Sequence, residues 1–166
     1  MSAAQLESER LILRPWCEAD FEPFAAYYAE EETARFVGGL CTRPQAWRRF
    51  AAMLGHWQLR GYGEWAVEIK ASGAFAGAVG LLFPEGWPEL ELGYWLTLEQ
   101  QGHGYATEAA RTARQYAREV LGKQTLVSYI DPLNLPSIRV AERLGAVYED
   151  TIALCGFGDH RVYRYA

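Results

Sequence analysis

The sequence has few cysteines, no long apolar run and no concentration of basic charge. Its three cysteines, Cys17, Cys41 and Cys155, lie far apart without a CxxC pair, which argues against a disulfide framework and against a zinc site. No stretch reaches the length of a membrane span, and the N-terminus lacks the basic and apolar regions of a signal peptide. We therefore expect a cytoplasmic protein with no membrane segment and no bound metal.

Acidic residues outnumber basic ones, with 21 Asp and Glu against 16 Lys and Arg, for a net charge of -5. Binding to nucleic acid without sequence preference needs clustered cations that neutralise phosphates, and here the cations are scattered. We expect no nucleic-acid partner. A chain of 166 residues suffices for one compact domain and is short for two of ordinary size, so we expect a single domain over residues 1–166.

The spacing of apolar residues predicts a mixed α/β fold. Strand patterns cover residues 10–16, 64–70, 74–83, 89–98 and 124–130 and two stretches of 146–165; helical patterns cover 20–28, 43–60, 106–120 and 136–144. Short connections between 64 and 98 predict an antiparallel meander, and the helix after 98 predicts that strands 89–98 and 124–130 are parallel. We expect a mostly antiparallel sheet of about seven strands, with one parallel pair, flanked by about four helices.

The turn from Gln101 to Ala106 reads Gln-Gly-His-Gly-Tyr-Ala and precedes a helix with a stripe of small residues. Backbone N–H groups converge on an anion at such a place, and the helix N-terminus adds about half a positive charge. Gly102 and Gly104 allow left-handed backbone angles and close approach to phosphate oxygens. The Gly-Lys-Ser/Thr of a Walker loop is absent, and Thr107 stands where a dinucleotide fingerprint needs its third glycine. The glycines alone fit a phosphate cradle or a structural turn.

The pattern Gln101-x-x-Gly104-x-Ala106 resembles the Q/R-x-x-G-x-G/A motif of the GNAT N-acetyltransferases. Further similar segments are Glu9-Arg10-Leu11-Ile12-Leu13-Arg14-Pro15, Leu92-Gly93-Tyr94-Trp95-Leu96, Gly104-Tyr105-Ala106-Thr107-Glu108-Ala109, and Asn134 with Ser137, Arg139-Val140-Ala141 and Leu144-Gly145. Together they resemble the RimJ/RimL-like branch from Glu9 to Tyr165. The resemblance implies the GNAT fold, with the parallel strand pair at the cofactor site, and acetyl-CoA as the donor.

The resemblance also implies which residues hold acetyl-CoA. The backbone amides of its pyrophosphate site are those of Gln101, Gly102, His103, Gly104, Tyr105 and Ala106, with Thr107 as a further contact. The pantetheine would run beside residues 95–97, where the N–H of Leu96 could polarise the thioester carbonyl.

Asn134 and Ser137 open the next predicted helix. Asn134 either caps that helix or, as the resemblance implies, bonds the pantetheine arm. Ser137 either solvates the helix start or protonates the departing thiolate. Many GNAT enzymes use a tyrosine where this chain has Ala141, so solvent, Tyr94 and Tyr129 remain alternatives to Ser137 as the acid.

Glu91 is the candidate for the base that frees the amine nucleophile. A lysine-type amine with a pKa of about 10.4 is almost wholly protonated at neutral pH, so it needs a base more than an N-terminal amine does. Strand alternation puts Glu89, Glu91 and Gly93 on the face opposite Leu90 and Leu92. If that face meets the substrate, Glu91 takes a proton or attracts a cationic amine; otherwise it is an ordinary polar residue of a strand.

These patterns predict direct transfer of an acetyl group from acetyl-CoA to a primary amine, on a protein N-terminus or a small molecule, in a ternary complex. No cysteine lies beside a base, which disfavours an acetyl-enzyme. The alternative is an acetyl-CoA-binding sensor or a non-catalytic partner domain of the same fold. The chain is expected to be a monomer or a homodimer.

Overall fold

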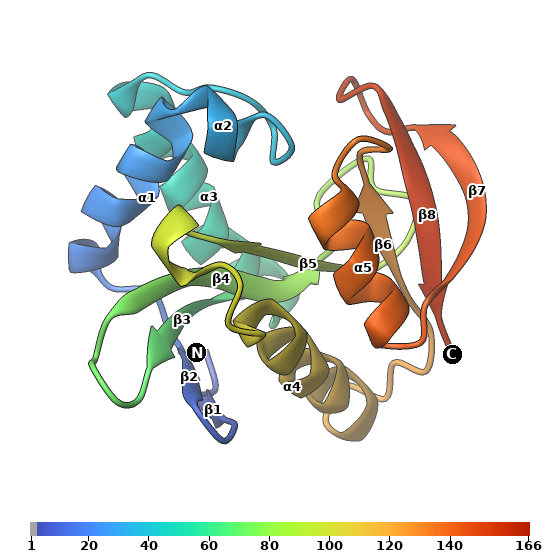
Figure 1. The fold of residues 1–166 in the computed structure, drawn as a ribbon, viewed down its shortest axis with the longest axis horizontal. Coiled ribbons are helices and arrows are strands. Elements are labelled where there is room, and N and C mark those ends of the chain that lie inside the picture. The colour runs from blue at the N-terminus through green and yellow to red at the C-terminus, as the bar shows by residue number, and fades with distance from the viewer. Residues whose placement is uncertain (1–2) are drawn as a thin grey trace.

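The computed structural model describes residues 3–166, which form an eight-stranded sheet with helices on both faces (Figure 1). The strands are β1 (Leu6–Glu7), β2 (Leu11–Arg14), β3 (Glu64–Ile69), β4 (Phe75–Leu82), β5 (Glu91–Leu96), β6 (Leu126–Ile130), β7 (Val147–Ala153) and β8 (Asp159–Tyr165). The α-helices are α1 (Phe21–Ala29), α2 (Glu31–Ala34), α3 (Arg43–Arg60), α4 (Tyr105–Glu119) and α5 (Leu135–Arg143), with 3-10 turns at Glu18–Asp20 and Leu98–Gln100.

The strand order is β1-β2-β3-β4-β5-β6-β8-β7, and within the described residues β5 and β6 are the parallel pair. This confirms the predicted mixed sheet. It has eight strands rather than about seven because the two-residue β1 pairs with β2, Leu6 opposite Leu13. The long helix α3 has the expected bounds, since Thr42 and Gln45 form a capping box at its start and Gly61 takes a left-handed φ of 77° at its end.

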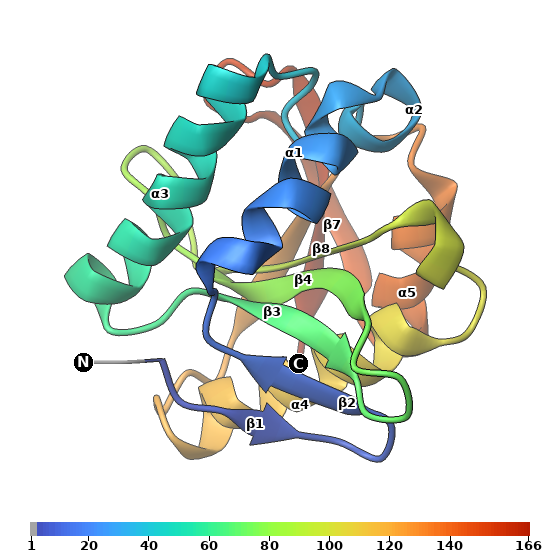
Figure 2. The same ribbon diagram turned by 90° about the vertical axis from the view of Figure 1, so that its left-hand side faces the viewer.

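The helices divide between the two faces of the sheet (Figure 2). On one face α4 packs its fully buried alanines, Ala109, Ala110, Ala113 and Ala117, close against the strands, as small side chains allow. On the other face α1 and α3 cover an aromatic cluster in which Trp16 meets Phe24 and Phe50 edge to face. Among residues 3–166 no helix is both long and apolar enough to cross a membrane.

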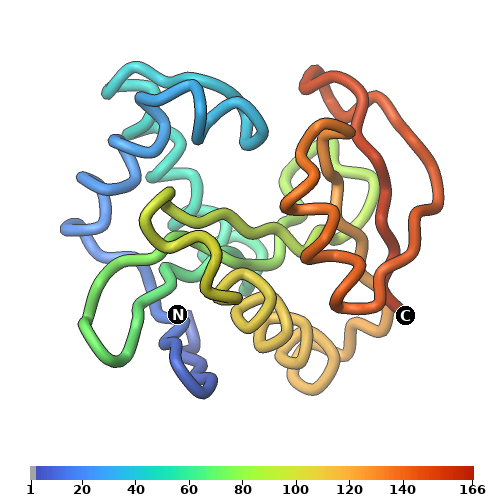
Figure 3. Tube along the Cα trace, in the orientation of Figure 1, coloured from blue at the N-terminus to red at the C-terminus, as the bar shows by residue number. Residues whose placement is uncertain are grey.

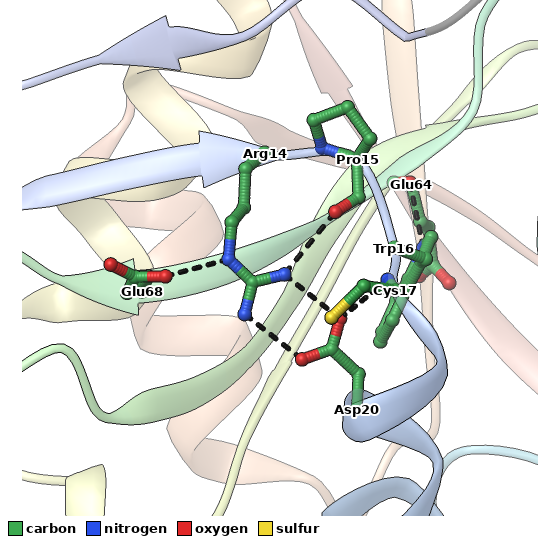
Figure 4. A network of polar contacts seen from close by, with 7 residues as sticks. All are labelled: Arg14, Pro15, Trp16, Cys17, Asp20, Glu64 and Glu68. Atoms are coloured by element: carbon green, nitrogen blue, oxygen red, sulfur yellow. Dashed lines mark hydrogen bonds and ion pairs between the residues drawn. The ribbon is translucent and has the colours of Figure 1, made fainter.

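A polar network fixes the turn from β2 into α1 (Figure 4). The Arg14 guanidinium donates to both carboxylate oxygens of Asp20, at 2.8 and 2.9 Å, and to Glu68 at 2.6 Å. Asp20 directly precedes α1, but its side chain makes no cap bond there, because Arg14 and the Cys17 N–H bind its carboxylate instead. The same turn brings the Trp16 indole within 2.9 Å of the Glu64 carbonyl oxygen on β3.

The sheet opens between β5 and β6. In the described chain their pairing consists of Glu91 opposite Val127, after which the strands part. The Ser128 hydroxyl donates to the Leu92 carbonyl at 2.6 Å, so a side chain replaces a backbone bond of the ladder at this point. Figure 3 shows the chain leaving β5, descending through α4 and returning as β6 in the half that also holds α5, β7 and β8. The opening thus lies where the two halves of the sheet meet.

Candidate active site

Two cavities meet at the opening between β5 and β6. The first, which we call the α4 groove, has a volume of about 600 Å³ and is lined by the end of β5, the following turn, the start of α4 and α5. The second, the carboxylate pocket, has a volume of about 290 Å³ and is lined by α3, Trp87, Tyr129 and the acidic side chains Glu64 and Glu91. Both cavities are bordered by Phe36, Val37, Tyr94, Trp95, Asn134 and Ser137.

The glycine turn forms one end of the α4 groove. Gly102 and Gly104 have φ values of 82° and 79°, so both positions use the left-handed conformation that glycine allows. Gln101 ties the turn to the sheet, because its side-chain amide donates to the Leu96 carbonyl at 3.2 Å. The groove is lined by Gln101, Gly102, Gly104, Tyr105, Ala106 and Thr107. His103 does not line it; its ring lies against Tyr105 instead.

Arg10 holds this turn from outside the groove. Its guanidinium donates to the His103 carbonyl at 2.8 Å and lies 4.7 Å from the centre of the Tyr105 ring. Glu108, in the first turn of α4, accepts from the Arg10 Nε and backbone N–H, each at 2.7 Å. The His103 carbonyl is thereby drawn away from the groove. No local pattern in the sequence indicates this role of Arg10, because the contact joins residues far apart in the chain.

Thr107 supplies an independent sign of a ligand at the start of α4. Thr107 lines the groove, and its buried hydroxyl oxygen is the side-chain polar atom for which residues 3–166 provide no hydrogen-bond partner. A buried hydroxyl without a partner is unfavourable, and a phosphate oxygen would supply one. The exposed Arg139 and Arg143 of α5 line the same groove and add positive charge. These residues fit the phosphates of acetyl-CoA.

Replacing Thr107 with valine tests this fit. We expect Thr107→Val to weaken acetyl-CoA binding by roughly fivefold to tenfold, because one donor to phosphate is lost. The unfolding temperature should stay equal or rise, because a buried unpaired hydroxyl is removed. Calorimetry and thermal unfolding measure both, with Thr112→Val as the matched control, since that hydroxyl bonds the Glu108 carbonyl within α4. Lower stability with unchanged affinity would assign Thr107 a structural role only.

The edge of β5 offers backbone donors to the opening. The Thr97 N–H donates to the Ala76 carbonyl of β4 at 2.9 Å, and antiparallel ladders bond alternate residues. The N–H groups of Tyr94 and Leu96 therefore point away from β4, toward the space beside β6. In agreement, the Leu96 carbonyl faces that side and accepts from Gln101. The predicted oxyanion donor, Leu96, thus has suitable backbone geometry, and Tyr94 offers a second donor that sequence reasoning missed.

Asn134, Ser137 and Tyr94 meet at the start of α5. The Asn134 side chain accepts from the Ser137 N–H at 3.4 Å, so Asn134 caps α5, which is one of the two roles expected for it. The Tyr94 hydroxyl donates to the Ser137 carbonyl at 2.7 Å, and burial raises the pKa of Tyr94 well above its usual value. Two protonated hydroxyls, those of Ser137 and Tyr94, therefore border the opening, whereas Ala141 is fully buried in the core.

Glu91 lines the carboxylate pocket, which is the placement needed if it is to act on a substrate. Leu92 and Leu96 face α4 on the opposite side of β5. The Trp87 indole donates to the Glu91 carboxylate at 2.6 Å. Burial raises the pKa of Glu91 to about 7, although the Trp87 indole and the Tyr129 backbone N–H oppose this rise. A carboxyl with this pKa can exchange a proton near neutral pH.

Glu64 is the acidic residue of the pocket that sequence reasoning missed. It begins β3, its residue exposure is 6%, and the Trp16 and Trp57 indoles both bond its carbonyl, at 2.9 and 2.7 Å. Burial, and then repulsion from Glu91, raise the pKa of Glu64 to about 8, whereas Arg49 lowers it. An acidic residue heading the apolar run Trp65-Ala66-Val67 was the available signal.

The three cysteines lie away from the candidate site. Cys17, Cys41 and Cys155 line neither cavity. Among residues 3–166 no three His, Cys, Asp or Glu side chains are grouped so that they could hold a metal ion. The chemistry available at the opening is therefore that of carboxyl, hydroxyl and backbone N–H groups.

A mixed sheet opened at one parallel pair, beside a helix N-terminus suited to phosphate, is the architecture of a coenzyme A-dependent acyltransferase. The model of the acetyltransferase (GNAT) domain matches residues 10–147. The chain therefore belongs to the GNAT acetyltransferase family, which uses acetyl-CoA.

Individual relatives agree with this assignment. The uncharacterised protein YkkB of Bacillus subtilis (strain 168) is 38% identical over 158 residues, covering 89% of this chain and 88% of that protein. The crystal structure of an acetyltransferase from Agrobacterium tumefaciens str. C58 has a TM-score of 0.91 at 36% identity, covering 100% of this chain and 96% of that one. RimL, a ribosomal L7/L12 alpha-N-protein acetyltransferase solved with coenzyme A, shares the fold with a TM-score of 0.78 at 18% identity, covering 98% and 97%.

Proposed function

We propose that this acetyltransferase moves the acetyl group of acetyl-CoA directly to a primary amine, on a small molecule or a protein N-terminus, in a ternary complex. One observation carries the proposal: the α4 groove and the carboxylate pocket share their border at the opening between β5 and β6. A donor in the groove and an acceptor in the pocket would meet at that border.

Acetyl-CoA supplies an activated acetyl thioester. The backbone N–H groups of the groove-lining residues of the turn, Gln101, Gly102, Gly104, Tyr105 and Ala106, and the Thr107 hydroxyl bind its pyrophosphate, and Asn134 contacts the pantetheine arm. Leu96 donates its backbone N–H to the thioester carbonyl. Support comes from the left-handed glycines of the turn, the unpaired Thr107 hydroxyl and the direction of the β5 N–H groups.

The acceptor enters as an ammonium, and Glu91 takes one proton from it. The nitrogen lone pair attacks the carbonyl carbon, a C–N bond forms, and negative charge develops on the oxygen facing the Leu96 N–H. The C–S bond then breaks, and the departing thiolate takes a proton from the Ser137 hydroxyl. The nitrogen's second proton restores that hydroxyl, directly or through water, which leaves amide, free thiol and one proton on Glu91.

A thiol-release assay with acetyl-CoA and a panel of small amines and N-terminal peptides tests this proposal. We expect thiol release that depends on the amine, with one N-acetyl group formed per thiol. Acceptors acetylated on oxygen or sulfur, with no amine acetylated, would refute it.

Ser137→Ala tests the proton donor. We expect kcat to fall by roughly tenfold to a hundredfold, because the thiolate loses its acid, while the KM for acetyl-CoA changes less than about threefold. Tyr94→Phe is the comparison variant, because it keeps the ring and removes the neighbouring hydroxyl. A normal kcat in Ser137→Ala with a reduced kcat in Tyr94→Phe would transfer the acid role to Tyr94.

A further inference from the structure

The carboxylates of Glu64 and Glu91 both lie next to the position that a Cβ of Gly93 would occupy. A Cβ built on Gly93 would stand 3.9 Å from Oε1 of Glu64 and 4.0 Å from Oε1 of Glu91, so these oxygens flank the same point. Gly80, on β4 between them, is also without a side chain, and a Cβ there would come within 2.2 Å of the Glu64 Cα. Neither glycine places a side chain between the carboxylates, and the atom nearest to the Gly93 Cβ position is the apolar Cδ1 of Leu82, at 3.2 Å.

The Glu64 carboxylate borders the carboxylate pocket without a partner from the chain. Within residues 3–166 no group lies within hydrogen-bonding or ion-pair distance of it, although its residue exposure is 6%. Taking a carboxyl from water without a partner is unfavourable, so this one is arranged for a group that the chain itself does not supply. Its backbone is held firmly, because two indoles bond the Glu64 carbonyl.

The other charged and titratable groups around the pocket leave this position open. They are Arg49 and His56 on α3, Tyr28 on α1, Tyr94 on β5, Tyr129 and Asp131 at the end of β6, and His160 on β8. Arg49 is engaged with the carbonyls of Val37 and Gly38, at 3.2 and 3.4 Å, and His56 with Tyr62 and Phe83. Neither Arg49 nor the His56 ring, whose Nε2 accepts from the Phe83 N–H, is bonded to the Glu64 carboxylate, so an added cation could reach that carboxylate from the pocket.

The two carboxylates differ in their distance from the opening. Glu91 stands on β5, at the edge of the opening, whereas Glu64 stands on β3, two strands away, or about 10 Å between main chains. Resting on the proposed N-acetylation, we propose that the acceptor is a small aliphatic diamine whose reactive nitrogen faces Glu91 and whose distal ammonium pairs with Glu64. A pocket of about 290 Å³ also favours a small acceptor over an extended peptide.

Matched acceptors test this inference in the thiol-release assay. Propane-, butane-, pentane- and hexanediamine are compared with the alkyl monoamines of equal length. We expect kcat/KM for the best diamine to exceed that of its monoamine by at least about tenfold, because the distal ammonium stabilises the ionised form of Glu64 and pairs with it. Equal values for diamines and monoamines, or a preference for N-terminal peptides, would overturn the inference.

Two variants assign the preference to Glu64. Glu64→Gln should lower kcat/KM for diamines at least about tenfold more than for monoamines, since the distal ion pair alone is lost. Gly93→Ala, which fills the space between the carboxylates without changing charge, should reduce the same preference. Glu85→Gln removes a carboxylate from a fully exposed side chain and should preserve it. An equal loss for both amine classes in Glu64→Gln would overturn the inference.

The inference and the proposed function fail differently. If no amine or peptide is acetylated on nitrogen, the proposed N-acetylation fails and the inference with it. If monoamines or peptides are acetylated as well as diamines, N-acetylation stands and the role of Glu64 is refuted.

Discussion

Gly104→Glu is expected to abolish acetyl-CoA binding, with a dissociation constant raised by at least about a hundredfold. Gly104 precedes the first residue of α4 at a φ of 79°, so a side chain strains the turn whose N–H groups face the groove. Its Cβ would stand 3.4 Å from the Arg10 guanidinium that holds the turn. The new carboxylate would also repel the pyrophosphate. Isothermal calorimetry measures the loss directly.

Gly122→Glu is the matched control for that variant. Gly122 has a φ of 65°, with no atom within 4 Å of its Cβ position, and lies beyond the opposite end of α4. Both substitutions place glutamate in a left-handed conformation, which costs about 1–2 kcal/mol. We expect similar losses of stability and normal acetyl-CoA affinity in the control. Unchanged affinity in Gly104→Glu would remove the turn from the cofactor site.

Glu91→Gln is expected to lower kcat/KM at neutral pH by roughly a hundredfold or more and to move the pH optimum upward. Burial raises the pKa of Glu91 to about 7, and a base works when deprotonated, so the normal rate should rise as the pH passes through 7. In the variant the rise should follow the acceptor's own pKa, near 10 for an alkyl amine. The measurement is kcat/KM against pH with one acceptor.

Glu89→Gln provides the control for charge. The Glu89 carboxylate pairs with Arg164 at 2.8 and 2.9 Å, and this hydrogen bonding lowers its pKa. We expect its pH profile to match that of the unaltered protein. A profile in Glu91→Gln that still rises near pH 7 would show that another group is the base.

The elements that sequence reasoning found are those with local signals. The 18-residue α3 repeats its apolar positions over several turns and carries a cap at each end, so its bounds follow from the pattern. The strands β3 to β5 follow from short apolar runs separated by turns that contain glycine. The two-residue β1 and four-residue α2 are too short for any period to appear, and they form because neighbouring segments hold them.

The residues of the candidate site also fall into those with a local sequence signal and those without one. The glycine turn and the Asn134 helix start were visible because backbone geometry and capping depend on adjacent residues. The sequence alone indicates no role for Glu64 or Arg10, because each contacts residues distant in the chain. The Glu64 carboxylate lies near that of Glu91, with Gly80 and Gly93 between them, and Arg10, just before β2, donates to the His103 carbonyl. The ion pair of Arg14 with Asp20 has no local signal either, because the carboxylate could equally cap α1.

The central claim is direct transfer from acetyl-CoA to an amine, and thiol release at stoichiometric enzyme tests it most directly. Enzyme and acetyl-CoA are mixed first without acceptor and then with an amine, while free thiol and N-acetyl product are followed together. The account predicts no thiol before the amine is added and equal amounts of thiol and N-acetyl product afterwards. A burst of thiol equal to the enzyme before any amine is present, with acetyl left on the protein, would contradict it.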